Sequence, residues 1–146
     1  MSVQQLKRRF NLKEYNKMPQ VGILQQDERV ELIRGEILKR SPAGRLHAAC
    51  VNRLTRLFSQ RLGDRALVRV QNPVELDNYS EPEPDVVLLE PKADFYASGH
   101  PQSQDVFLIV EVADSTIKFD GEIKVALYGE NNVCLLYTSP SPRDTD

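Results

Sequence analysis

Two acidic residues stand where the sequence predicts buried β-strands. Asp85 follows two prolines in the stretch SEPEPDVVLLE, and Glu111 interrupts the apolar run FLIVEV. A carboxylate in such a strand costs free energy unless a cation or hydrogen bonds compensate it. If the two strands are neighbours, Asp85 and Glu111 could meet at one end of the sheet, where their oxygens suit Mg²⁺. The pair therefore indicates a site for a divalent cation.

Lys124 lies on the helix that the sequence predicts after Glu111. A lysine beside a metal-bound water can orient that water and offset negative charge on a phosphoryl oxygen. Two acids and a lysine therefore favour hydrolysis of a phosphodiester bond. Structural interpretations stay open for each: Asp85 as an acid at a strand end, Lys124 and Glu31 as solvent-facing residues, and His47 as a packing residue.

The elements that must position these residues follow from local patterns. Asn11 and Glu14 form a capping-box pattern, Arg34-Gly35 suits a two-residue hairpin turn, and Gly63 suits a helix end. The sequence predicts helices over 11–19, 47–62 and 117–130 and a β-hairpin over 29–40. It also predicts strands over 66–76, with a break near Pro73, and over 84–90 and 105–114. The nearly continuous apolar runs of the last two strands predict that both of their faces are covered.

The charges are unevenly distributed along the 146 residues, although the net charge is only −2. Nine Lys or Arg residues against two acids lie between Arg34 and Arg69, whereas twelve Asp or Glu residues against two lysines lie between Val70 and Glu122. The basic part could bind an anion next to a cation site in the acidic part. The alternative is two ordinary solvated faces.

The chain offers no sign of export or of a membrane span. Its two cysteines are too few for a disulfide framework, and no apolar stretch approaches the roughly 18 residues that a membrane span needs. We therefore expect a cytoplasmic protein without a membrane partner. Residues 133–146 include two Ser-Pro pairs and charged residues that leave nothing to bury, so we expect a disordered tail. This tail also looks like a translated cloning or sequencing adapter, so we expect it to be non-native, in which case the native carboxy-terminal part is missing.

Six segments in order resemble the bacterial Uma-two family of the PD-(D/E)XK nuclease superfamily. These are VELIRGEI, SPAGRLHAACVNRL, VQNPVEL, SEPEPDVVLL, FLIVEVADST and FDGEIKVALY. In this resemblance Asp85 matches the PD element, Glu111 the second acid, and Glu31 an acid from early in the fold. The superfamily usually has its lysine two residues after the second acid, where this chain has Ala113. The family's variant has it on the next helix, and Lys124 fits that position.

The resemblance implies an α/β (α+β) fold, a restriction endonuclease-like mixed β-sheet flanked by helices, over residues 1–132. It implies a DNA endonuclease in which Asp85 and Glu111 bind Mg²⁺ or Mn²⁺ and Lys124 and Glu31 complete the catalytic set. His47 and Gln71 are expected at the rim, and Arg53 and Arg56 are expected to contact DNA. A homodimer is compatible with this expectation. The alternative is a non-catalytic nucleic-acid or protein-binding module on the same fold.

Overall fold

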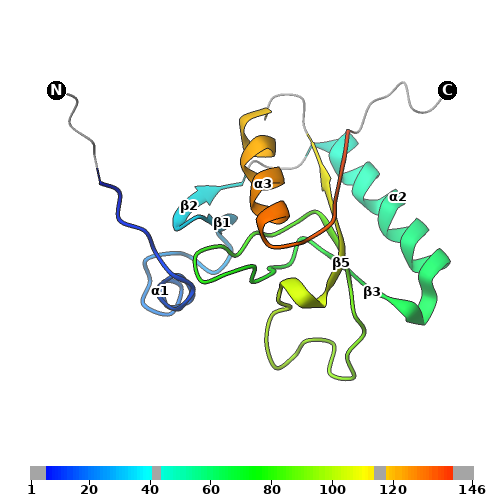
Figure 1. Ribbon diagram of the computed structural model, residues 1–146, viewed down its shortest axis with the longest axis horizontal. Helices are drawn as coiled ribbons and strands as arrows, with labels where there is room; N and C mark the ends of the chain where they lie inside the picture. The colour runs from blue at the N-terminus through cyan, green and yellow to red at the C-terminus, as the bar shows by residue number, and fades with distance from the viewer. Residues whose placement is uncertain (1–5, 41–43, 114–117, 140–146) are drawn as a thin grey trace.

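A four-stranded sheet forms the centre of the fold in the computed structural model, which describes residues 6–40, 44–113 and 118–139 (Figure 1). The strands lie in the order β3–β4–β5–β6. They span Leu67–Val70 (β3), Val86–Leu89 (β4), Val106–Val112 (β5) and Leu135–Thr138 (β6). β3, β4 and β5 pair antiparallel, whereas β6 runs parallel to β5. The mixed sheet confirms the expected fold class.

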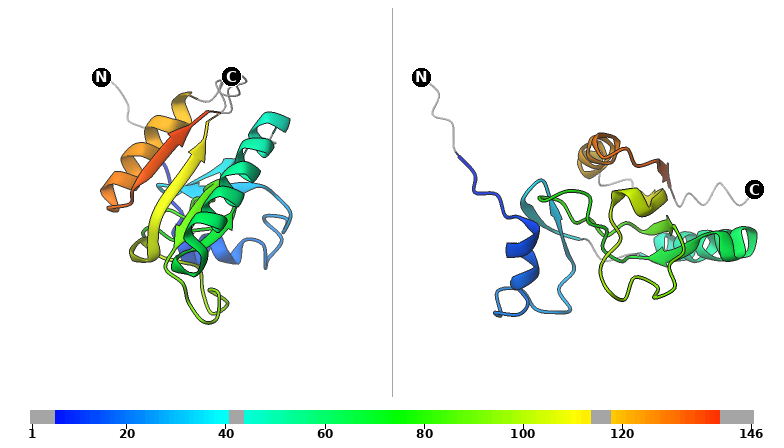
Figure 2. Two further views of the ribbon diagram at one scale, coloured as in Figure 1. Left: turned by 90° about the vertical axis from the view of Figure 1, so that its right-hand side faces the viewer. Right: turned by 60° about the horizontal axis from the view of Figure 1, so that its bottom comes forward.

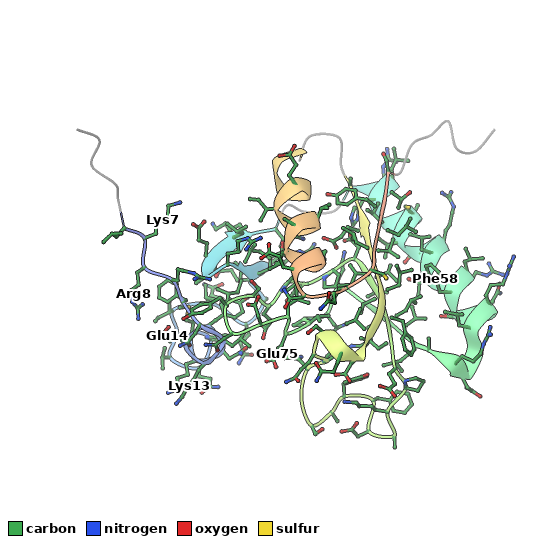
Figure 3. The ribbon with its side chains drawn as sticks, viewed as in Figure 1. Lys7, Arg8, Lys13, Glu14, Phe58 and Glu75 are labelled. Carbon is green, nitrogen blue, oxygen red and sulfur yellow. The ribbon has the colours of Figure 1, made fainter. Side chains whose placement is uncertain are left out.

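Two helices cover opposite faces of this sheet: α2 (Arg45–Leu62) and α3 (Lys118–Glu130) (Figure 2). Alternate residues of each strand point to opposite faces. Val86 and Val110 therefore pack in one cluster with Val51 of α2, and Phe58 of the same helix adds to it (Figure 3).

The next residues along β4 and β5, Val87 and Ile109, face the other way and pack with Leu127 and Tyr128 of α3. Burial on both faces explains why these two strands are almost continuously apolar.

A separate hairpin joins β1 (Val30–Ile33) to β2 (Glu36–Lys39). Its turn residues Arg34 and Gly35 both have positive φ, 51° and 83°, as the tight two-residue turn requires. Leu32 exchanges backbone hydrogen bonds with Glu81, at 2.7 and 3.3 Å, which ties the hairpin to the chain segment before β4.

The short helix α1 (Leu12–Lys17) packs on this hairpin (Figure 1). The predicted capping box is present, because Asn11 and Glu14 each bond the other's backbone N–H. Tyr15 and Met18 form a small core with Leu32. Two further single turns of 3₁₀-helix complete the structure, at Gly63–Arg65 and Ser103–Asp105.

Two boundaries differ from the sequence expectation. The strand predicted over 66–76, with a break near Pro73, ends earlier, at Val70, because Gln71 adopts a positive φ of 51° and Pro73 has no N–H for a ladder. The prediction of disorder from residue 133 is wrong for β6. Its backbone pairs with the edge of β5, and Leu135 packs against the core on the α3 side. Residues 140–146 of the predicted tail lie outside the described residues.

Candidate active site

Asp85 lies directly before β4, at the end of a segment held between the hairpin and the sheet. Pro82 and Pro84 are fully buried in this segment, and their rings fix the backbone φ. The N–H of Val74 donates to the carbonyl of Pro82 at 3.0 Å. The Asp85 side chain accepts a hydrogen bond from the N–H of Val112 on β5 at 2.8 Å. The acid is therefore held at a defined point beside β5.

Glu111 on β5 completes a reciprocal contact with Asp85. Its Oε1 accepts a hydrogen bond from the backbone N–H of Asp85 at 3.0 Å. Both side chains are buried, with residue exposures of 4% for Glu111 and 5% for Asp85. The pairing of β4 with β5 confirms the assumption that the two strands are neighbours, and it brings the two acids together as expected.

Lys124 of α3 lies between two carboxylates. Its Nζ is 2.7 Å from Oε2 of Glu111 and 3.0 Å from Oε2 of Glu31. The other oxygen of Glu31 accepts a hydrogen bond from the N–H of Glu83 at 3.0 Å. Glu31 and Lys124 are only 2% and 7% exposed, so the interpretation that they face solvent is wrong.

Burial and mutual repulsion set the protonation of this cluster. Burial raises the pKa of Glu111; Lys124 counteracts this in part, and Asp85 and Glu31 reinforce it. Burial alone lowers the pKa of Lys124, but the attraction of Glu111 and Glu31 together outweighs it, and the pKa of Lys124 lies above its ordinary value. Lys124 is therefore an ammonium ion at neutral pH.

Two further side chains contact Asp85 from outside the sheet. His47, in the first turn of α2, places Nε2 3.1 Å from Oδ1 of Asp85. Arg40, which follows β2, places one guanidinium nitrogen 3.6 Å from the same oxygen and another 3.2 Å from Glu83. Asp85 is thus the point where the hairpin, α2 and the sheet meet.

The remaining predicted residues lie around this point or outside it. The backbone N–H of Gln71 is 3.1 Å from the carbonyl oxygen of Pro84 and 3.2 Å from that of Asp85, so Gln71 borders the acid. Arg53 and Arg56 are exposed on α2, whereas Val51 of the same helix is buried in the core. These arginines are therefore placed on the outer surface of the molecule.

A family model described as "Putative restriction endonuclease", named Uma2, matches residues 12–142. The chain belongs to the Uma2 family. This confirms the resemblance found in the sequence. None of the curated proteins matches the sequence.

A crystal structure described as that of a "putative nuclease belonging to DUF820" from Anabaena variabilis superposes on the chain with a TM-score of 0.66. The match covers 90% of this chain and 74% of the other, at 14% sequence identity. At this low identity the similarity supports the nuclease-like fold of the Uma2 chain and carries no residue roles.

Sequence reasoning missed Arg40 and Glu83, which pair with each other beside Asp85, and Tyr128, which packs between α3 and the sheet in the core. Glu83 lies two positions before Asp85, and Tyr128 lies one helical turn after Lys124, so spacing from a predicted site residue could have found both. Arg40 offered no such signal, because it reaches Asp85 only through the packing of the hairpin against the sheet.

Within residues 6–40, 44–113 and 118–139, no group of three or more His, Cys, Asp or Glu side chains is arranged to hold a metal ion. Within these residues, Asp85 and Glu111 are therefore not part of a preformed cage of three or more such side chains. No helix in the described part of the Uma2 chain is long and apolar enough to cross a membrane.

Proposed function

We propose that this Uma2 protein is a metal-dependent DNA endonuclease that hydrolyses phosphodiester bonds. The observation that carries the proposal is the buried Lys124 ammonium held between Glu111 and Glu31, next to Asp85. Buried charges are expensive to maintain, and such clusters with shifted pKa values concentrate at catalytic sites. The family description and the nuclease-like fold support the same class of reaction.

Asp85 and Glu111 fit the requirements of Mg²⁺ or Mn²⁺. Hard cations take carboxylate oxygens, and Mg²⁺ commonly takes only one or two of them and fills its shell with water and substrate phosphate. The charge balance supports a cation as well. The cluster holds four carboxylates, those of Glu31, Glu83, Asp85 and Glu111. Among the described residues, the permanently charged cations that form ion pairs with them are two, Arg40 and Lys124.

The chain's own residues would divide the remaining work. When bound, the divalent ion would supply Lewis-acid stabilisation of the negative charge that develops on the phosphoryl group. Two N–H groups of Lys124 are used by Glu111 and Glu31, which leaves its third N–H for a reacting oxygen. Glu31 acts by holding Lys124 in place. Arg40 and the N–H of Val112 hold Asp85 in the same way.

The exposed arginines of α2 are the proposed DNA contacts. Arg53 and Arg56 are on a helix whose first turn carries His47, which contacts Asp85. A duplex whose phosphates lie along α2 would therefore run toward the acidic cluster. Phosphate contacts of this kind give affinity without sequence information, so no particular DNA sequence is implied.

Cleavage of supercoiled plasmid with Mg²⁺ or Mn²⁺ tests the proposal, with EDTA as the metal-free condition. Asp85→Asn is the informative variant, because an amide oxygen can still accept the hydrogen bond of Val112 while the negative charge is lost. We expect nicking that requires metal and disappears in Asp85→Asn. Asp105→Asn is the matched control, because Asp105 is also buried but pairs with Lys92 away from the cluster.

One observation favours a second candidate, a non-catalytic nucleic-acid or protein-binding module. Each carboxylate oxygen of Asp85 and Glu111 already has a partner within the protein, which is also what purely structural acids would show. A folded protein that neither cleaves DNA nor binds Mn²⁺ in calorimetry would support this alternative. Mn²⁺ binding that is lost in Asp85→Asn would argue against it.

A further inference from the structure

Tyr128 of α3 has a buried hydroxyl group that nothing in the fold explains. Its side chain is fully buried, and its phenol oxygen has no hydrogen-bond partner among the residues that the structure describes. Buried polar groups are nearly always hydrogen-bonded, since an unsatisfied one costs free energy. Phenylalanine would fill the same space without that cost.

Two other buried tyrosines show the ordinary arrangement. The hydroxyl of Tyr15 donates to the carbonyl of Val30 at 3.3 Å, and that of Tyr96 donates to the carbonyl of Glu90 at 2.5 Å. Both rings are anchored in the structure by these bonds. Tyr128 differs from them because its hydroxyl has no hydrogen-bond partner among the described residues.

The unused donor lies on the side of α3 that carries the cluster. Tyr128 follows Lys124 by one helical turn, so the two side chains emerge from the same face of α3. Burial raises the pKa of the Tyr128 phenol, and the charges of Glu111, Glu31 and Asp85 raise it further. Arg40 opposes the shift, and the phenol keeps its proton at neutral pH and remains a hydrogen-bond donor.

We infer that the Tyr128 hydroxyl positions the water molecule that attacks phosphorus. It donates one hydrogen bond to the water oxygen, whose other lone pair stays free for the attack, while a carboxylate of the cluster accepts a proton from the water. The inference rests on the proposed nuclease function. A water molecule suits this location, because the carboxylates of the cluster can accept its hydrogen bonds. Tyr128 would thus orient the nucleophile without binding the metal or the DNA.

The variant Tyr128→Phe tests this role in three measurements on the same chain. We expect kcat for plasmid nicking to fall by about 10- to 100-fold, while KM for DNA changes by less than about twofold, because only an interaction with the attacking water is lost. We expect the affinity for Mn²⁺ to stay unchanged. We also expect the midpoint of urea unfolding to stay the same or to rise, because an unsatisfied buried hydroxyl is removed.

Tyr15→Phe is the matched control, because it removes a buried hydroxyl that has a partner. It should lower the urea midpoint and leave kcat unchanged. Full activity in Tyr128→Phe would overturn the inference, and so would a lowered urea midpoint, which would show that the hydroxyl is structural.

The outcomes for the wild-type protein separate this inference from the proposed function. Metal-dependent cleavage by the wild type that is retained in Tyr128→Phe removes only the role of Tyr128. A folded wild type that binds no Mn²⁺ and cleaves no DNA overturns the nuclease proposal, and the role of Tyr128 with it.

Discussion

Glu81 should make the stability of this protein fall as the pH rises from 4.5 to about 7. The residue is 4% exposed and lies in the proline-rich segment before Asp85. Burial raises the pKa of Glu81 to about 7 from its ordinary 4.5; Asn16 opposes the shift, and Glu75 and Glu83 add to it. The folded chain therefore keeps a proton on Glu81 in a pH range where the unfolded chain has lost it.

The size and sign of the effect follow from proton linkage. Below pH 4.5 both states carry the proton, and Glu81 does not penalise folding. Between pH 4.5 and about 7 only the folded state holds it, so the free energy of unfolding falls by about 1.4 kcal/mol for each pH unit. Above pH 7 both states are ionised, and the total loss levels off at about 3 kcal/mol.

Urea unfolding of the wild type and Glu81→Gln between pH 5 and pH 8 measures this effect. Glutamine is neutral at every pH, so Glu81→Gln should gain stability relative to the wild type as the pH rises, with most of the gain appearing by pH 7. The exposed Glu28 provides the control, because Glu28→Gln should follow the wild-type pH profile. A difference between wild type and Glu81→Gln that is independent of pH would refute the reasoning.

Three further changes test other parts of the structure. Lys124→Met should lower the free energy of unfolding in urea by about 3–5 kcal/mol, because Glu31 and Glu111 lose their shared cation. Adding Glu111→Gln to this variant should recover part of that loss, and no recovery would contradict the pairing. Gly35→Ala should lower the free energy of unfolding by more than about 1 kcal/mol in thermal or urea unfolding, because Gly35 has a φ of 83° and an added Cβ would lie 2.5 Å from Cβ of Arg9. Gly44→Ala is the control and should be tolerated, because its added Cβ would meet no atom within 4 Å. Replacing Arg53 and Arg56 with alanine should reduce the slope of log K for DNA binding against log salt concentration by about 1 for each lost phosphate contact. Lys13→Ala on α1 is the control and should leave this slope unchanged. An unchanged slope in the arginine variants would remove α2 from the DNA interface.

The local elements could be predicted because their signals lie within a few residues of one another. Asn11 and Glu14 bond each other's backbone across one helical turn, and Arg34-Gly35 closes a hairpin through its own φ angles. The apolar period of α2 depends only on which side chains fall on one face of the helix. The same local reasoning failed for β6, since a short strand with Ser-Pro pairs behind it gains its stability from the edge of β5 and not from its own sequence.

By itself the sequence determined the types of the site residues: acids inside apolar strands, and a lysine on the helix that follows. Only the tertiary structure decided that Lys124 pairs with both Glu111 and Glu31 and that Arg40 and His47 contact Asp85. It also decided that the Tyr128 hydroxyl has no partner among the residues that the structure describes. These contacts join residues that are far apart in the chain, so their existence depends on strand order and on the packing of α3 and the hairpin against the sheet. Residue types set which interactions are favourable, whereas the fold sets which of them are within reach.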